Sequence, residues 1–538
     1  MYKSVLSNRI KLSQTAISLI FATIIAIICN YFLLAHKFSI GLEGNKIAIL
    51  FLEIALNYFV VFALLYLSSF NKIILGILIA ALLSLSLIAA YSFNEFSILI
   101  TQIVIANTLD NIGNFNDIIT AKAIILYGTF FIALPLILLS KITIIKDKNR
   151  RAVFIFSGII LLIFVAILSS LKHQNRKGVI FAYPPFGLLK SYINYRSDIY
   201  TSLKNKPPLL PINDIVKTKI SSQKIKNLKV VLIIGESARS KNFSINGYQT
   251  DTTPRIKKIN NFLSFKDVAP CSNLTIYSVD CMLSHKTAKD FHLPANEESI
   301  IKVFEKLKFS TAYFSTQKAV GDDNGLIMLA SQAQQYHFGD SIANKIGGNM
   351  VYDEYLLDDL KLDLARDGDS FIILHTQGSH FLFDDRYTDD FKIFTPICGN
   401  KNLEKCTQQQ VINSYDNSIA YTDFFIDSVV NELKKQNALL IYISDHGQFL
   451  GENKIYYHGP SDSIEGPNHK VPMFLWMSDK LIADSFYRRK FNNAKKEINK
   501  KLSHDNLFDS LLDCAGIEID SRNLSVCKSK NADKIISF

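Results

Sequence analysis

Hydrophobic residues in the first third of the chain form five long, almost uninterrupted stretches. They lie at about Ser13–Ala35, Ile47–Ser69, Ile73–Tyr91, Ala121–Ser140 and Ala152–Leu171. A helix that crosses a bilayer needs roughly 20 apolar residues. A buried helix of a soluble protein can match one such stretch, but five in succession favour membrane spans. The pattern therefore predicts a transmembrane domain of five helices.

After about residue 227 the hydrophobic pattern changes, and short apolar runs alternate with amphipathic segments. The predicted strands are Val230–Ile234, Ser310–Phe314, Phe371–Leu374, Leu439–Ser444 and Pro472–Met477. Helical spacing of apolar residues predicts helices at Glu297–Leu307 and Val411–Lys434. Continuously apolar runs mark strands that are buried on both faces. Their alternation with helices predicts an α/β domain with a mainly parallel sheet covered by helices.

The distribution of basic residues predicts the orientation in the membrane. Lys3, Arg9 and Lys11 precede the first stretch and five basic residues crowd residues 141–151, whereas residues 92–120 contain none. By the positive-inside rule the N-terminus is cytoplasmic, and five crossings place the rest of the chain outside. We expect residues 1–171 to form the transmembrane domain, 172–226 an interfacial connector and linker, and 227–538 an exported domain.

Cysteine usage agrees with export of the second domain. Six of the seven cysteines are neighbouring pairs in that domain: Cys271 with Cys281, Cys398 with Cys406, and Cys514 with Cys527. Such pairs predict three disulfides. A metal-ligand role is the weaker alternative, because none of them forms a Cys-x-x-Cys clamp. The seventh, Cys29, lies in the first apolar stretch and is expected to pack there.

The formal net charge of +11 raises the question of nucleic acid binding. The exported location and the lack of any nucleic-acid-binding motif in the sequence argue against it. A basic domain at a membrane surface instead meets anionic lipid headgroups. We therefore expect membrane lipids, and no nucleic acid, among the partners.

Two of the predicted strands end in residues that bind metals. Glu236 follows Val230–Ile234 after one glycine, and Asp445 and His446 directly follow Leu439–Ser444. Ligands of open α/β sheets bind just beyond the carboxyl ends of the strands. Carboxylates with an imidazole form the oxygen and nitrogen donor set that a zinc-type cation prefers. The two segments therefore predict the two halves of one metal site.

Hydroxyl and imidazole groups complete the candidate chemistry. The loop between Cys271 and Cys281 carries several hydroxyls, and a hydroxyl beside a divalent cation can act as a nucleophile at neutral pH. A polar loop that is stapled for stability explains these residues equally well. His380 and His458 lie near strand ends and glycine-rich turns, where neutral imidazoles suit proton transfer. An incidental loop histidine is the alternative at each position.

Taken together, the motifs resemble the lipid A-modifying phosphoethanolamine transferases of the alkaline phosphatase/sulfatase superfamily. The motifs that carry the resemblance are Gly-Glu-Ser-Ala-Arg at 235–239, Thr-Ile-Tyr-Ser-Val at 275–279, Gly-Ser-His at 378–380, Phe-Thr-Pro at 394–396, Ser-Asp-His-Gly at 444–447 and Tyr-His-Gly at 457–459. With the five predicted spans in front of them, they extend the resemblance over nearly the whole chain.

The resemblance implies a role for each residue of the candidate site. It makes Thr275 the nucleophile, and it places His380 and His458 where they contact the phosphoethanolamine group or a second metal ion. The ligands that it implies for Zn²⁺ are Glu236, Thr275, Asp445 and His446. It assigns substrate binding to Asn107 and Asn111 in the third loop, and to Gln317 and Lys318 after a predicted strand.

The implied reaction transfers phosphoethanolamine from phosphatidylethanolamine to a phosphate of lipid A or lipopolysaccharide. A covalent phosphoethanolamine–threonine intermediate forms and diacylglycerol is released. The implied location is the bacterial inner membrane, with the catalytic domain in the periplasm. A cationic amine on the lipid A phosphates would weaken the binding of polymyxin, which implies resistance to this peptide.

Several positions depart from the family pattern and leave the acceptor and any second metal open. Asn111 stands where the family has Thr, Gln448 replaces the Glu of Asp-His-Gly-Glu, and Phe381 begins the segment that replaces Gly-Pro. The loop Ser315–Lys318 also differs from the Trp-led segment that the family has there. Transfer to a core sugar or a glucan would use the same core chemistry.

Three other functions share parts of the pattern. A sulfatase would need a Cys/Ser-x-Pro-x-Arg site, which neither Cys271 nor Cys281 begins. A phosphoglycerol transferase would lack the paired cysteines. A membrane scaffold with a degenerate domain would have lost some of the ligand set, which is complete in this sequence.

Overall fold

The computed structural model describes most of the chain in two compact units, Met1–Thr201 and Ser202–Phe538. The described residues are 10–31, 33–35, 45–96, 128–170, 183–204, 209–293, 295–318, 325–346, 350–452, 455–457, 469–520 and 524–528. Three predicted site residues, Asn107, Asn111 and His458, lie outside these ranges.

The first unit consists of helices, all of them apolar except the last, which also carries charged residues. They are α1 (Gln14–Thr23) continued by the π-helix η1 (Ile24–Ile28), α3 (Asn45–Ser68), α4 (Lys72–Phe96), η3 (Gly128–Ala133) with α8 (Leu134–Lys141), α9 (Arg150–Ser170) and α11 (Phe186–Lys204). Within the described residues, two segments are long and apolar enough to cross a membrane, Ile47–Ser68 and Lys72–Ser92. These two correspond to the second and third predicted spans. The total of five spans remains a prediction.

One end of this unit is held together by polar contacts between distant segments. A parallel pair of short strands joins β1 (Ile10–Ser13) to β2 (Ile142–Ile145). Asp147 Oδ2 accepts hydrogen bonds from the Thr15 amide at 3.0 Å and from the Thr15 hydroxyl at 2.8 Å. A carboxylate at a helix N-terminus satisfies otherwise unpaired N–H groups. The first helix is therefore anchored to the segment that precedes α9.

The second unit is built on an eight-stranded sheet in the order β13-β5-β12-β9-β4-β8-β6-β7. Its strands are β4 (Leu228–Gly235), β5 (Phe262–Ala269), β6 (Ser310–Ser315), β7 (Gln335–His337), β8 (Ser370–His375), β9 (Asn437–Ser444), β12 (Val471–Met477) and β13 (Lys501–Ser503). Seven strands run in one direction, and β12 is antiparallel to both of its neighbours. The predicted mainly parallel sheet is thus confirmed.

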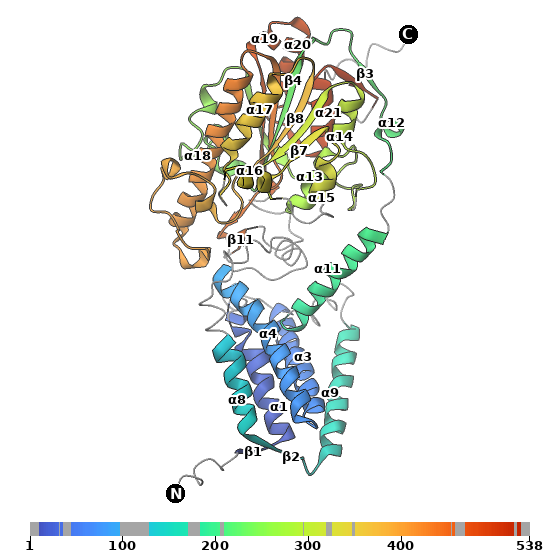
Figure 1. The fold of residues 1–538 in the computed structure, drawn as a ribbon, viewed down its shortest axis with the longest axis vertical. Helices are drawn as coiled ribbons and strands as arrows, with labels where there is room; N and C mark the ends of the chain where they lie inside the picture. Colours follow the sequence, from blue (N-terminus) through green and yellow to red (C-terminus); the bar gives the residue numbers. More distant parts are fainter. Residues whose placement is uncertain are drawn as a thin grey trace. The chain divides into compact units, whose positions relative to one another are not determined.

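The central strands are buried on both faces, as their continuous apolarity predicts. All eight residues of β4 are buried. Val230, Leu232 and Ile234 belong to the main hydrophobic cluster on one face, so the alternate residues Val231 and Ile233 point to the other face. Figure 1 shows α17 (Leu356–Leu364) and α18 (Gln408–Leu433) on one side of the strands and α13 (Thr275–Leu283), α14 (Ile300–Lys306) and α21 (Asp505–Cys514) on the other. This arrangement excludes water from the sheet except at its ends.

Two of the predicted elements differ from the structure in their bounds, and three strands of the sheet, β5, β7 and β13, were not predicted. The helix expected at Glu297–Leu307 begins later, because Ser299 caps the N-terminus of α14 with its side chain. The helix expected at Val411–Lys434 begins earlier, at a capping box formed by Thr407 and Gln410. Strand β5 has polar residues between its apolar ones, so it lacks the continuous apolarity of the central strands.

The three predicted disulfides are present in the second unit. They join Cys271 to Cys281, Cys398 to Cys406, and Cys514 to Cys527. The first closes the segment that carries Thr275 onto the end of α13. Cys29 is a buried free cysteine in the first unit.

Candidate metal centre

The carboxyl ends of β4 and β9 bring the candidate metal ligands together. The two strands are parallel neighbours, with Gly235 opposite Ser444. The residues that follow this pair are Glu236 on one strand and Asp445 on the other, and the Asp445 amide donates to Gly235 O at 2.8 Å. A side chain at Gly235 would overlap the Tyr442 hydroxyl, so only glycine fits at this position.

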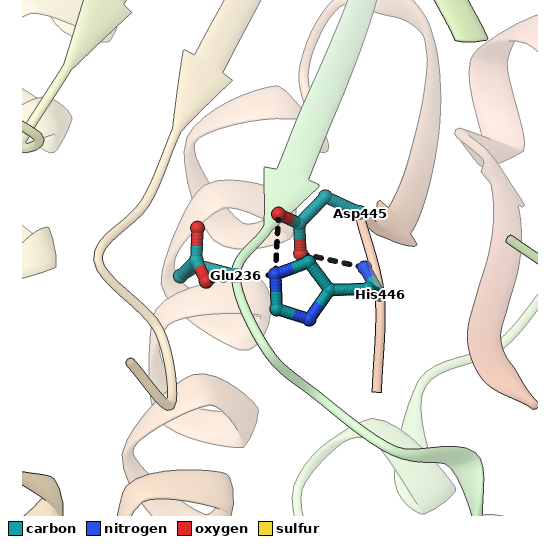
Figure 2. Close-up of side chains that lie close together, drawn as sticks. All are labelled: Glu236, Asp445 and His446. Atoms are coloured by element: carbon teal, nitrogen blue, oxygen red, sulfur yellow. Dashed lines mark hydrogen bonds and ion pairs between the residues drawn. The ribbon is translucent and has the colours of Figure 1, made fainter. Parts of the chain in front are cut away.

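Glu236, Asp445 and His446 form one buried cluster, as Figure 2 shows. Their candidate ligand atoms all lie within 4.8 Å of one another. His446 Nε2 is 3.4 Å from Glu236 Oε1 and 3.3 Å from Asp445 Oδ2. His446 Nδ1 lies 2.8 Å from Gly447 O and donates to it, which leaves the lone pair of Nε2 facing the carboxylates.

The polar atoms of this cluster fit a divalent cation. Asp445 Oδ2 is buried and accepts no hydrogen bond from the described part of the chain. A buried carboxylate oxygen in that position is costly unless a cation or a donor satisfies it. Two carboxylates and one neutral imidazole nitrogen also supply the ligand types that zinc-type cations take. The cluster can therefore hold a metal ion.

The electrostatics of the cluster also favour a bound cation. Burial raises the pKa of Asp445 to about 7, and the Glu236 carboxylate beside it acts in the same direction. Burial also acts to raise the pKa of Glu236, but His446, His380 and the hydrogen bonds from Ser237 and Gln317 hold it below its ordinary value. The negative charge of Glu236 thus opposes ionisation of Asp445, and a cation bound between the two carboxylates would relieve this repulsion.

Thr275 places its hydroxyl in this cluster. It is the first residue of α13, and its Oγ1 lies 2.9 Å from Glu236 Oε2 and 3.2 Å from His446 Nε2. Its side chain is partly exposed, whereas the three acid and imidazole groups are fully buried. The N-cap residue Leu274 makes no side-chain cap, so the start of α13 presents backbone N–H groups beside the hydroxyl. A hydroxyl in this position is both close to the candidate metal ligands and partly exposed.

Gln317 contacts Glu236, one of the candidate metal ligands, in the structure. Its Nε2 donates to Glu236 Oε2 and to Thr376 O, each at 3.0 Å, and faces His375 Nε2 at 3.4 Å. His375 Nδ1 is in turn 2.8 Å from the Tyr313 hydroxyl. This chain of contacts fixes the orientation of the Glu236 carboxylate. Its role in substrate binding, and that of the half-buried Lys318 next to it, remain predictions.

His380 lies on the loop that follows β8, close enough to Glu236 and His446 to interact with both electrostatically. Burial lowers its pKa to about 4, so the imidazole is neutral at physiological pH. Gly378 (φ 47°) lets this loop pass against Glu236, since an added Cβ would lie 2.8 Å from Glu236 O. The Ser379 amide then donates to Glu236 O at 2.9 Å.

Asp353, which no sequence pattern identified, ties two loops of the site together. Its buried carboxylate accepts from the Thr316 hydroxyl at 2.6 Å, the Gln377 amide at 2.7 Å and the Gly378 amide at 3.0 Å. These donors belong to the loops that carry Gln317 and His380. The sequence around a single acid does not reveal that it holds two loops together, because its hydrogen-bond partners are distant in sequence.

His504, which was not singled out from the sequence, has a positioning role in the structure. Its Nε2 donates to Ser444 O at 2.9 Å, and its Nδ1 lies 3.2 Å from the Cys271 amide and 3.3 Å from the Ser278 hydroxyl. The neutral imidazole thus joins the end of β9 to the segment that carries Thr275. Burial lowers the pKa of His504 to about 4.

Comparisons with known proteins place these features in a family. The sulfatase family model matches residues 229–517. Phosphoethanolamine transferase EptA of Escherichia coli (strain K12) is 29% identical over 459 residues, which are 80% of each chain. The Kdo(2)-lipid A phosphoethanolamine 7''-transferase of the same strain is 28% identical over 512 residues, covering 90% of this chain and 89% of the relative.

Among solved structures, the integral membrane protein lipooligosaccharide phosphoethanolamine transferase A from Neisseria meningitidis is similar in fold. It superimposes with a TM-score of 0.76 at 22% identity, covering 96% of this chain and 98% of that one. The likeness therefore extends over both units of the fold.

The metal-ligand assignment predicts loss of bound metal when a ligand is replaced. Asp445→Asn keeps the shape of the side chain but removes its charge, so we expect at least about tenfold weaker binding of a divalent cation. The number of metal ions bound per protein chain is measured by inductively coupled plasma mass spectrometry after dialysis of the full-length protein. Asp251→Asn, an exposed acid remote in sequence, is the control. Equal metal content in wild type and Asp445→Asn would contradict the assignment.

The buried His504 predicts a defined sensitivity to acid. Its folded-state pKa lies below the unfolded value, so its contribution to stability is complete above pH 6.5 and is lost as the pH falls through about 4. The loss is on the order of 3 kcal/mol for a shift of this size. We expect His504→Gln to show a shallower fall in melting temperature than wild type between pH 6.5 and 4. Parallel curves would show that His504 does not titrate in this way.

Proposed function

The chain belongs to the sulfatase family, and on that basis we propose that it is a phosphoethanolamine transferase that modifies lipid A. Two relatives that match 80–90% of the chain are named as phosphoethanolamine transferases, and the name of one of them specifies Kdo(2)-lipid A. The observation that carries the proposal is the Thr275 hydroxyl, which lies within hydrogen-bond distance of Glu236 and His446 in the buried acid and imidazole cluster. A nucleophile in that position suits transfer of a phosphoryl group.

Zn²⁺ is the proposed cofactor, held by Glu236, Asp445 and His446 with the Thr275 oxygen. When bound, it lowers the pKa of a neighbouring hydroxyl and neutralises negative charge on a phosphate. The donor set of two carboxylates and an imidazole supports this choice. A second ion near His380 and His458 is left open.

The first half-reaction uses Thr275 as a nucleophile toward phosphatidylethanolamine. Thr275 Oγ1 forms a bond to phosphorus as the bond from phosphorus to the diacylglycerol oxygen breaks. The Thr275 hydroxyl gives up one proton, and the diacylglycerol oxygen takes up one proton as it leaves as an alcohol. We assign the acceptance and return of that proton to His380, whose imidazole is kept neutral by burial. The N–H groups at the start of α13 would bind the phosphate oxygens, because a helix N-terminus favours negative charge.

The second half-reaction returns the enzyme to its starting state. A phosphate oxygen of lipid A attacks the same phosphorus, and Thr275 Oγ1 leaves and regains a proton. The ethanolamine group keeps its positive charge throughout and ends on the lipid A phosphate. Because the covalent bond to Thr275 holds the phosphoethanolamine group at the site, the attack by lipid A needs only one further positioned encounter.

The proposed location is the bacterial inner membrane, with the N-terminus in the cytoplasm and the catalytic domain in the periplasm. Two apolar helices of the first unit and the three disulfides of the second support it. We propose five spans within residues 1–171, the connector 172–226 and the catalytic domain 227–538.

Mass spectrometry of lipid A tests the function directly. A Gram-negative host that expresses the chain should produce lipid A heavier by one phosphoethanolamine unit, and the Thr275→Ala variant should not. Thr275→Ser, which keeps a hydroxyl, should retain part of the activity. Unchanged lipid A with Thr275-dependent release of diacylglycerol would indicate that the acceptor is a core sugar or a glucan instead of lipid A. No change in either product from a correctly inserted protein would contradict the proposal.

A further inference from the structure

A group of polar side chains lies inside the apolar first unit, away from the metal cluster in sequence. Asn30 and Asn57 are buried, with 2% and 6% of their surface exposed. Tyr183 is also buried and packs with Leu33 and Leu50. Buried polar groups in helices that are apolar elsewhere are costly and mark functional sites.

Part of this group has a structural explanation. The Asn30 and Asn57 side-chain amides both donate to Pro184 O, each at 3.1 Å. Asn30 also donates to Ile25 O and Ala26 O in the π-helix η1. A π-turn leaves backbone carbonyls available to side chains. These contacts fix the turn that precedes α11 against the helices.

The Asn57 carbonyl has no such explanation. Asn57 Oδ1 is buried and accepts no hydrogen bond from the described residues. Leaving a buried acceptor unpaired costs about 1–3 kcal/mol. An apolar residue at position 57 would avoid that cost. The presence of this oxygen therefore suggests that it accepts a hydrogen bond from a donor outside the described residues.

Glu53 adds a negative charge to the same place. It precedes Asn57 by one helical turn, so both side chains lie on one face of α3, and its carboxylate lies beside the Tyr183 hydroxyl. It is the only charged residue between Lys46 and Lys72. Its position is about 12 Å along the helix from Asn45, the first residue of α3. The group is therefore rich in acceptors and carries negative charge within apolar surroundings.

We propose that Glu53 and Asn57 bind the primary ammonium of a zwitterionic phospholipid headgroup. Three N–H donors on one cation match the Glu53 carboxylate and the unpaired Asn57 Oδ1. A trimethylammonium headgroup has no N–H to donate, and an anionic headgroup would be repelled by Glu53. The proposal rests on the proposed function, because phosphatidylethanolamine is the donor lipid there, and it assigns that lipid a site within the first unit.

Lipid retention by the full-length protein tests the site without any turnover. The Thr275→Ala protein is purified in detergent, incubated with equal amounts of phosphatidylethanolamine, phosphatidylcholine and phosphatidylglycerol, and examined by native mass spectrometry. We expect preferential retention of phosphatidylethanolamine. Glu53→Gln should weaken that retention at least about tenfold, as loss of a hydrogen bond to a charged group implies. Glu53→Asp should restore part of it.

Two control variants separate binding from folding. Tyr183→Phe removes the hydroxyl beside Glu53 but keeps both acceptors, so it should retain the preference if Glu53 binds the lipid. Ser84→Ala, in α4, removes a hydroxyl that donates to Ala80 O of its own helix, its one hydrogen bond among the described residues, and should change nothing. Melting temperatures of all variants identify any that fail to fold.

Equal retention of the three lipids by the Thr275→Ala protein, or an unchanged preference in Glu53→Gln, would overturn the site. So would loss of the preference in Tyr183→Phe to the same extent as in Glu53→Gln, because a purely structural contact would behave in that way. These outcomes are independent of the lipid A experiment. Modified lipid A with no effect of Glu53→Gln on retention would refute the site and leave the proposed function standing.

Discussion

The parallel pairing of β4 with β9 is the constraint on which the candidate site depends. Their register sets Gly235 opposite Ser444, so the candidate metal ligands that follow the two strands lie side by side. Glu236 comes from one strand, and Asp445 and His446 from the other, with a separation in sequence of about 200 residues. A shift of one residue in this register would turn the ligands to opposite faces of the sheet. The extensive burial of both strands protects the register.

Other parts of the second unit bring groups to that fixed edge. The Cys271–Cys281 disulfide and the neutral His504 hold the start of α13, and thereby Thr275, against the end of β9. Asp353 holds the loops after β6 and β8, which carry Gln317 and His380. The glycines at 235 and 378 permit the backbone approaches that this crowding requires. A rigid shell of this kind keeps the ligands in place before any substrate arrives.

The sequence predicted the parts of this arrangement that depend on local pattern. Continuous apolar runs located the central strands, and the acids directly after them identified Glu236, Asp445 and His446 as one cluster. The contact between Gln317 and Glu236 was not predicted, because it depends on how two loops meet after folding. The roles of Asp353 and His504 were missed for the same reason. Strand β5 was missed because it is amphipathic, and Asn57 was missed because one polar residue in an apolar helix carries little signal.

The central claim is that Thr275 carries the transferred group, and peptide mass spectrometry tests it most directly. The purified full-length protein is incubated with Zn²⁺ and phosphatidylethanolamine in the absence of an acceptor, quenched in acid and digested. The account predicts a phosphoethanolamine adduct on Thr275 that disappears when acceptor lipid A is added before quenching. Release of diacylglycerol with an adduct on another residue, or with no adduct at any time, would contradict it.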